Sequence, residues 1–497
     1  MFGFELLLFS ALFSALSSIL FALATRKLNL AEFAEVFLYA SFSLSFAAML
    51  LLLHYLLTDN FSIYYVYAYS QREMSVEYKI GALWAGKEGS LLLWAFASLL
   101  VASIFTNYGK KDVRKAKALA VLTAICFFLL LMLLFSNPFE VLAFKYSNGL
   151  GMNPLLRTPE MIIHPPLVFF GYALVACMFA SHLTGIEDRN LARLSWALMT
   201  AGIVLGGWWA YRTLGWGGFW GWDPVENSSL LPWLSLTAYL HARKGKEFFA
   251  YLSMVFVAFT AFITRSGILS SVHSFGEDPM GWAYLFLVLA CAVPLVRKWE
   301  VEDRCYTSLL FGAMIVVVLL GTVANLFRNV DRSYYLITFT PIFFATAMIA
   351  LYRLRNSNRK LIHIGVILLF VGATSVWFFE QKDTVVLNPD GKADGIEFYL
   401  QNVSTRWTPE KTIVRAKILS SLGLIEPEIH VYPQSTVSKV YIIGNPFLDY
   451  YFAMKSAGSN SVELEFYRVP LISLVWLGSA LLILGLASQK LGLRPRK

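Results

Sequence analysis

The feature that most constrains this chain is a series of long apolar runs, each close to the length of about 20 residues that crosses a bilayer as a helix. We count about thirteen runs, near 3–24, 33–57, 90–106, 118–135, 166–184, 194–211, 228–242, 247–264, 282–296, 306–326, 337–353, 360–379 and 469–488. A soluble domain carries roughly a quarter charged residues, whereas only 15% are charged here and 57% are hydrophobic. We therefore expect an all-α polytopic membrane protein with about 13 transmembrane helices.

Basic residues fall in alternate connections between these runs. They form seven segments: Arg26-Lys27, Lys110 to Lys117, Arg189 and Arg193, Arg243 to Lys246, Arg297-Lys298, Arg353 to Lys360, and the tail from Lys490 to Lys497. Cytoplasmic loops carry an excess of Lys and Arg. The pattern predicts a multi-pass protein of the cell membrane with its N-terminus outside and its C-terminus in the cytoplasm. Because these loops explain the net charge of +9, we expect no nucleic-acid partner.

The start of the chain and its last outward segment complete the organisation. The run 3–24 has no basic segment before it and no small-residue cleavage site, so it is expected to be the first span and not a signal peptide. Residues 428–432 and 461–466 alternate polar and apolar side chains, which is typical of strands. The predicted domains are a helical bundle at 1–379 with an outward Trp-rich loop at about 212–229, an extracytoplasmic β-rich domain at 380–468, and a final transmembrane helix with a basic cytoplasmic tail at 469–497.

The most distinctive segment is the outward loop from Trp216 to Asn227, which we call the Trp loop. Its aromatic residues Trp216, Phe219, Trp220 and Trp222 are interleaved with Gly217, Gly218 and Gly221. Glycine allows a partner to approach the backbone closely, and flat rings supply apolar contact area. The pattern predicts a shelf for a large planar aromatic ligand. The alternative is an aromatic belt packed against lipid.

The acidic end of the Trp loop is interpreted first as the start of a helix. Asp223, Pro224 and Glu226 occupy the spacing of a helix N-cap, first and third residue, and they precede the apolar run at 228–242. Contact with the ligand is the second interpretation for Asp223 and Glu226. Asn227, which closes the loop, is counted with the candidate binding residues.

Two histidines lie in outward segments on either side of the Trp loop. His164 precedes Pro165, and a residue before proline favours extended backbone, so its imidazole is predicted to stand outside the following helix. His273 follows the run that ends near 264. Two imidazoles on one side of the membrane, flanking an aromatic shelf, suggest a bis-histidine iron site.

Two further histidines lie within apolar runs. His241 stands two residues before Arg243, and His363 stands three residues after Lys360, so both are predicted near the inner ends of their helices. An ionisable group inside a span usually has a partner. One buried b-type haem ligated by both is one interpretation, and two separate histidines bonded to helix carbonyls is the other. We assign structural roles to the remaining three: His54, His182 and His430.

Haem propionates are anionic and require positively charged donors. Arg265, at the outer end of its run, and Arg212, just before the Trp loop, are the candidates nearest in sequence. Both are equally well explained as ordinary anchors at the ends of spans.

The Trp loop resembles the tryptophan-rich signature of haem-handling membrane proteins that serve cytochrome c maturation. Four further stretches resemble the CcmF type, the haem lyase subunit of the system I pathway: Gly86 to Trp94, Asn153 to Leu156, Thr264 to Gly267, and Val475 to Gly478. The resemblance covers about residues 65–490. Phe219 departs from it by standing where the family usually has Trp, and Lys87 by standing where it usually has His. The chain is also shorter than typical bacterial members.

This resemblance implies a function. His164 and His273 match the ligands of the haem being delivered, and His241 and His363 match those of a resident haem b. The implied reaction attaches haem to the two cysteines of a CxxCH segment of apocytochrome c. The implied partners are apocytochrome c, a haem-chaperone donor and other maturation subunits within the lipid membrane, with quinol as a hypothetical reductant of the resident haem.

Three other functions remain open from the sequence. A haem exporter would use the Trp loop without joining haem to a protein. A quinol-oxidising b-haem enzyme would use His241 and His363 but not the Trp loop. A solute transporter would hold no cofactor.

Overall fold

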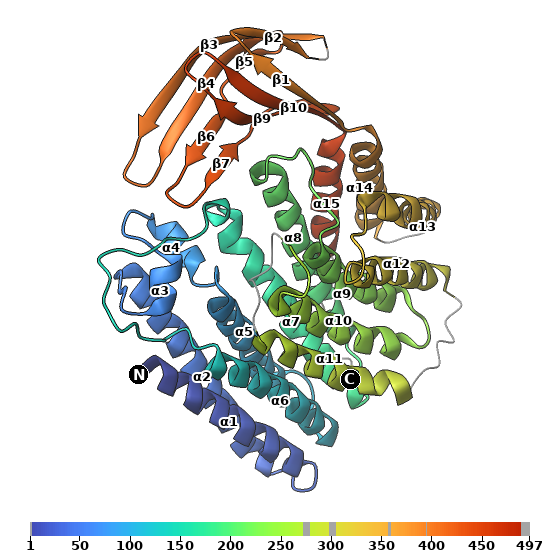
Figure 1. The fold of residues 1–497 in the computed structure, drawn as a ribbon. Helices are drawn as coiled ribbons and strands as arrows, with labels where there is room; N and C mark the ends of the chain where they lie inside the picture. Colours follow the sequence, from blue (N-terminus) through green and yellow to red (C-terminus); the bar gives the residue numbers. More distant parts are fainter. Residues whose placement is uncertain (1, 272–278, 298–304, 356–358, 394, 489–497) are drawn as a thin grey trace.

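Most of the molecule is a bundle of long helices with a small β domain at one end (Figure 1). The computed structural model describes residues 2–271, 279–297, 305–355, 359–393 and 395–488. The long helices are α1 (Phe2–Ala24), α2 (Leu30–Leu57), α5 (Lys87–Asn107), α6 (Val113–Phe135), α7 (Glu160–Leu183), α8 (Arg189–Thr213), α9 (Pro224–His241), α10 (Lys246–Ser266), α11 (Ala283–Arg297), α12 (Tyr306–Ala324), α13 (Arg332–Arg353), α14 (Lys360–Phe379) and α15 (Ile472–Ala487).

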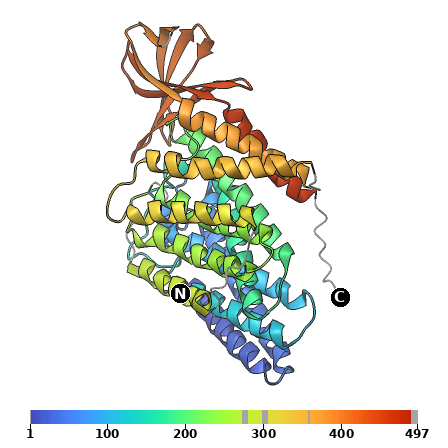
Figure 2. The same ribbon diagram turned by 90° about the vertical axis from the view of Figure 1, so that its right-hand side faces the viewer.

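These helices account for the predicted apolar runs, each of which lies on one of them. Among the described residues, ten helices are long and apolar enough to cross a membrane. The other three, α9, α11 and α15, have 18, 15 and 16 residues. The helices lie side by side (Figure 2), and large apolar side chains such as Phe286 and Phe344 are exposed on their outer surfaces. The prediction of a polytopic helical membrane protein with a β-rich domain is confirmed.

Helices α14 and α15 pack backbone against backbone. Gly365 and Gly372 on α14, and Gly478 and Gly485 on α15, recur seven residues apart and so form one stripe on each helix. A Cβ at Gly365 would lie 2.7 Å from the Gly478 carbonyl oxygen, and a Cβ at Gly478 would lie 2.7 Å from the Gly365 carbonyl oxygen. Small residues permit this approach between membrane helices. The pair therefore forms a rigid base for the β domain, which joins the two helices in sequence.

Short helices occur where only outward loops were predicted. These are α3 (Tyr64–Tyr69), α4 (Val76–Ala82), and the two 3-10 turns η1 (Pro154–Leu156) and η2 (Pro279–Trp282). Each is too short to produce a clear hydrophobic period.

The β domain runs from Gln381 to Pro470, close to the predicted 380–468. Its strands are β1 (Gln381–Leu387), β2 (Asp390–Ala393), β3 (Ile396–Trp407), β4 (Thr412–Ser420), β5 (Gly423–Ile425), β6 (Glu428–Val431), β7 (Thr436–Lys439), β8 (Tyr441–Gly444), β9 (Leu448–Ala457) and β10 (Val462–Pro470). They form two antiparallel sheets, ordered β1-β10-β9-β8 and β2-β3-β4-β6-β7, with β5 paired to β4. Phe398, Phe452 and Phe466 are fully buried between the sheets.

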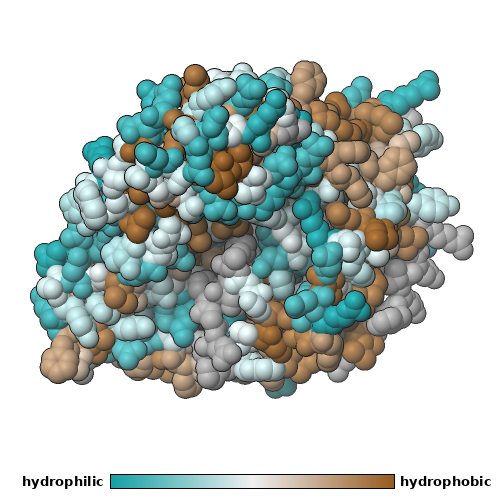
Figure 3. Space-filling model, turned by 45° about the horizontal axis from the view of Figure 1, so that its top comes forward, coloured by the Kyte–Doolittle hydropathy of each residue, from teal (hydrophilic) through white to brown (hydrophobic). Residues whose placement is uncertain are grey.

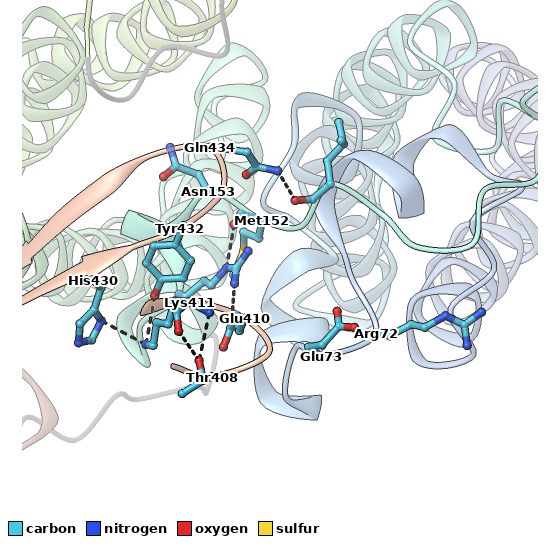
Figure 4. A network of polar contacts seen from close by, with 12 residues as sticks. Arg72, Glu73, Met152, Asn153, Thr408, Glu410, Lys411, His430, Tyr432 and Gln434 are labelled. Carbon is cyan, nitrogen blue, oxygen red and sulfur yellow. Dashed lines mark hydrogen bonds and ion pairs between the residues drawn. The ribbon is translucent and has the colours of Figure 1, made fainter. Parts of the chain in front are cut away.

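The ends of two β hairpins rest on the segment that leads into α7 (Figure 4). Arg157 forms an ion pair with Glu410 in the β3–β4 turn, and its guanidinium lies 5.2 Å from the centre of the Tyr432 ring. Gln434, in the β6–β7 turn, donates a hydrogen bond to the Leu150 carbonyl. These contacts hold the domain over the helix that carries His164.

The surface changes character between the two parts of the molecule. Hydrophilic residues gather over the β domain, and hydrophobic residues gather along the flank of the helices (Figure 3). This division matches a domain in water attached to a bundle in lipid.

Candidate functional site

The acidic end of the Trp loop is a helix cap. The Asp223 carboxylate accepts a hydrogen bond from the Val225 amide at 2.8 Å, and Glu226 accepts one from the Asp223 amide at 3.2 Å, which completes a capping box at the start of α9. The first interpretation of these two residues is confirmed. Asp223 also accepts a 2.6 Å hydrogen bond from Ser271.

Trp222 is packed into the bundle. Its ring stacks on Tyr335 with centroids 4.5 Å apart and also contacts Phe339 and Trp377. The backbone φ of Trp222 is +57°, a conformation that costs a bulky residue free energy. Asn227, fully buried, donates to the Trp222 carbonyl and to the Tyr335 hydroxyl, both at 2.9 Å. Asn227 thus holds the strained residue in place.

The first half of the Trp loop packs against α14, α15 and the adjoining edge of the β domain. Phe219 is buried against Trp377 and Trp476, and Tyr211, at the end of α8, donates a 2.9 Å hydrogen bond to Asp449 of β9. Gly217 has a φ of +76°, and a Cβ there would lie 2.7 Å from both Glu380 and Tyr467. Gly217 and Phe219 are therefore enclosed by protein.

The glycines serve contacts within the protein, which corrects part of the sequence interpretation. A Cβ at Gly218 would lie 2.8 Å from the Trp216 ring, and one at Gly221 would lie 3.1 Å from it. The close approach that these glycines permit is made by Trp216 of the same loop. Trp216 and Trp220 are only partly buried, so they are the rings that remain available at the surface.

Glu380, at the end of α14, is a buried carboxyl beside the Trp loop. Burial raises its pKa above the ordinary value, and Arg332 at 3.6 Å opposes that shift.

His164 lies inside α7, so the prediction that it stands outside the helix is wrong. The helix begins at Glu160 and contains both Pro165 and Pro166. Pro165 cannot donate to the Met161 carbonyl, which normally makes such residues helix breakers. Here the Trp84 indole donates to that carbonyl at 2.8 Å and satisfies it from another part of the chain.

The His164 imidazole is held by α8. Its Nδ1 lies 2.7 Å from the Gly202 carbonyl oxygen, and a Cβ at Gly206 would lie 3.1 Å from the ring. A hydrogen bond from Nδ1 to a carbonyl fixes the orientation of the ring and the tautomer, with the lone pair on Nε2.

His273 lies outside the described residues. Ser271, two positions earlier, bonds to Asp223 of the Trp loop at 2.6 Å. The chain is thus attached to the Trp loop at Ser271.

A long cavity runs through the bundle from the Trp loop. Side chains of α8, α9, α12, α13, α14 and α15 line it, and it encloses about 1410 Å³ of space not filled by protein atoms, part of it open to the surroundings. At one end, the loop end, it is lined by Phe219, Trp220 and Trp222. At the other, the histidine end, it is lined by His241, Arg353 and His363. These ends lie at opposite termini of α9, roughly 27 Å apart at 1.5 Å per residue.

The cavity brings together the two histidines that were predicted as a pair. His241 Nδ1 bonds to the Thr237 carbonyl at 2.8 Å, so its Nε2 is the ring atom for metal ligation. His363 Nδ1 is buried without a hydrogen-bond partner among the described residues. A buried polar atom left unpaired costs about 1–3 kcal/mol, so this imidazole has unused bonding capacity in the cavity wall.

The two arginines predicted to donate hydrogen bonds to the haem propionates lie in different environments. Arg265 is buried and donates to the Lys87 carbonyl at 2.8 Å and to the Ser90 hydroxyl at 2.9 Å, on α5. Arg212 is exposed, with its guanidinium 5.6 Å from the centre of the Trp208 ring. Neither lines the cavity.

The sequence interpretation missed several residues that build the cavity. Trp196 stacks on Trp233 with centroids 5.4 Å apart, and each indole donates a hydrogen bond to a threonine, Thr237 and Thr200 respectively. Arg353 was assigned only to a cytoplasmic loop. The signal available was the spacing of Trp233, Thr237 and His241 at four-residue intervals, which places them on one face of α9.

Comparisons with known proteins agree with this architecture. A family model described as cytochrome C assembly protein matches residues 84–269. The chain is 30% identical to the probable cytochrome c-type biogenesis protein NrfE of Escherichia coli, over 90% of this chain and 93% of that one. It is 32% identical to the cytochrome c-type biogenesis protein CcmF of Haemophilus influenzae, over 70% of this chain and 62% of that one.

Coverage varies among the relatives. The match to the cytochrome c-type biogenesis protein NrfE of Haemophilus influenzae, at 39% identity, spans 46% of this chain and 40% of that protein. A solved structure titled cytochrome c heme lyase CcmF has the same fold, with a TM-score of 0.81 over 98% of this chain and 96% of that one, at 21% identity.

Proposed function

The chain belongs to the family of cytochrome c-type biogenesis proteins of the CcmF and NrfE type, and from that premise we propose that it is a haem lyase component. It holds haem at the outer face of the cell membrane and promotes attachment of that haem to the CxxCH cysteines of apocytochrome c. It acts in a complex that includes a haem-chaperone donor and other maturation subunits. The loop end faces outward, with the N-terminus outside and the C-terminus in the cytoplasm.

One observation carries the proposal: a single cavity joins the Trp loop to a pair of buried imidazoles. The aromatic lining suits a porphyrin face, and His241 Nε2 together with the unpaired His363 supplies two nitrogen ligands. These residues fit a resident haem b. When bound there, haem supplies one-electron transfer, with quinol as the electron source.

The delivered haem is the substrate of the loop end. His164, fixed through Nδ1 to Gly202, and His273 are its axial ligands. Trp216 and Trp220 contact the ring face. The other binding residues of the loop position those two indoles: the buried Gly217, Gly218, Phe219, Trp222 and Asn227, and the partly buried Asp223 and Glu226. Of the two candidate propionate partners, Arg212 is exposed and accessible to the substrate haem, whereas Arg265 is buried.

The reaction needs no oxidant. Each cysteine S–H adds across one vinyl group of the substrate haem, with sulfur bonded to one vinyl carbon and hydrogen to the other. The protein lowers the barrier by holding ring and peptide together. The histidine of the CxxCH segment then replaces one protein imidazole and releases the product.

The test is cytochrome c maturation in a strain that lacks the native gene. We expect His164→Ala or His273→Ala to abolish holocytochrome formation while the resident haem is retained. His54→Ala, on the exposed face of α2, is the matched control and leaves maturation intact. Maturation that survives both substitutions would disprove the assignment of His164 and His273 as ligands of the delivered haem. Release of haem without thioether formation would indicate an exporter.

A further inference from the structure

A second, more polar cavity adjoins the first at the histidine end. The two share His241, Arg353 and His363, and the second adds Arg193 from α8 and Arg359 from the start of α14. Three arginines from three separate helices thus converge beside the two imidazoles.

Arg359 is repelled by neighbouring positive charges. Burial lowers the pKa of Arg359, and the positive charges of Arg193 and Arg189 lower it further. Arg193 Nε is buried without a hydrogen-bond partner in the described part of the chain. No carboxylate of a described residue lies within ion-pair distance of Arg193 or Arg353. Like charges in a low-dielectric region are costly, so the arrangement calls for a bound anion.

We propose that the arginines bind the propionates of the resident haem, which fixes its orientation. This inference rests on the proposed function, because it requires haem between His241 and His363. The propionate edge faces Arg193, Arg353 and Arg359, and the vinyl edge faces the Trp loop.

The lining of the main cavity supports this orientation. Toward the loop end it consists of side chains such as Trp222, Phe339 and Trp377, and Arg353 is its one permanently charged lining residue among those described. Haem has one anionic edge and one apolar edge, so only one orientation pairs each with a matching wall. Arginine suits the task because its planar fork binds a carboxylate through two hydrogen bonds.

The experiment compares haem with haem dimethyl ester, which lacks the propionate charges. Full-length protein produced without haem is titrated with each in detergent, and binding is followed by the low-spin absorption band. We expect the wild type to bind haem about tenfold or more tightly than the ester. The ester cannot accept the charge-assisted hydrogen bonds that the propionates accept from the arginines. Arg193→Gln, Arg353→Gln and Arg359→Gln each reduce this preference, and the triple variant brings it close to one.

Arg189→Gln is the control, since Arg189 lies at the same end, pairs with Glu187 at 3.7 Å and lines neither cavity. It should keep the wild-type preference. The reduction potential of bound haem should also fall in the three variants, because removing positive charge disfavours the extra electron.

Several outcomes would overturn the proposal. Equal binding of haem and its ester by the wild type would do so without any variant. An unchanged preference in the variants, with loss of co-purified anionic lipid, would assign the arginines to a lipid headgroup. Failure of both ligands to give a low-spin band would refute the resident haem itself.

Discussion

The two ends of the cavity differ in the kind of polar group that each leaves unpaired. At the loop end, Asp223, Glu226, Asn227 and Ser271 make hydrogen bonds around Trp222, and Asn227 Oδ1 and the indole Nε1 atoms of Trp216, Trp222 and Trp377 are buried without partners among the described residues. At the histidine end, His363 Nδ1 and Arg193 Nε are buried without partners among the described residues. The unpaired groups of the loop end are neutral, whereas those of the histidine end can ligate a metal or carry a positive charge, which a bound ligand would explain.

The comparison teaches which residues are scaffold and which bind ligand. Most of the Trp loop maintains its own shape, and among its aromatic residues only Trp216 and Trp220 remain partly exposed. At the histidine end, His363 Nδ1 and Arg193 Nε lack such support from the described residues. Substitutions should therefore affect stability at the loop end and ligand binding at the histidine end.

The largest stability effect is expected for Trp222→Ala. Truncation of a buried aromatic side chain costs about 3–5 kcal/mol, and here it removes contacts with Tyr335, Phe339 and Trp377. Thermal unfolding in detergent measures this loss of stability. Trp407→Ala, at a side chain 80% exposed, is the control and should change little; equal losses in the two would show that the loop end is not scaffold.

Gly365→Ala should destabilise the histidine end by about 1–3 kcal/mol. The added methyl would lie 2.7 Å from the Gly478 carbonyl oxygen and push α15 away from the helix that carries His363. Unfolding and haem content are measured together. Gly312→Ala on α12, where a Cβ meets nothing within 4 Å, should be neutral or stabilising; a similar loss there would refute the role of close packing.

Asp223→Ala should cost about 1–2 kcal/mol through loss of the cap and should release Ser271. The matched variant Asp223→Asn retains an acceptor and should be close to wild type. Thermal unfolding and protease sensitivity near 271 report the two effects. Identical behaviour of the two variants would indicate that Asp223 acts through its charge and not as a cap.

The smallest effect concerns the β domain above the loop end. Burial lowers the pKa of His430 although Glu428 lies 2.7 Å away. Below the unfolded pKa of about 6.5 the unfolded chain takes up more protons than the folded one, so stability should fall as the pH drops from that value toward the folded pKa. His430→Gln should weaken this dependence in thermal unfolding, whereas His54→Gln should not.

The sequence predicted those elements that depend on interactions between neighbouring residues. The apolar runs, the alternation in 380–468 and the capping box of Asp223 and Glu226 each depend on neighbouring residues. The pairing of His241 with His363 was predicted from similar depth, and both line one cavity.

Features that depend on distant residues were missed. His164 is helical because Trp84, 80 positions earlier, satisfies the carbonyl that Pro165 frees. The arginines of the histidine end come from three helices, and each alone resembles an ordinary cytoplasmic anchor. The β domain was predicted, but its contacts with Gly217 of the Trp loop through Tyr467 and with Tyr211 of α8 through Asp449 depend on the tertiary fold.

The central claim is that His241 and His363 ligate one haem across the cavity, and the optical spectrum of the detergent-purified protein tests it most directly. The wild type should show a low-spin b-type spectrum with two axial imidazoles, and His241→Ala or His363→Ala should abolish it. Protein that is colourless when haem is abundant, or a spectrum unchanged in both variants, would contradict the account.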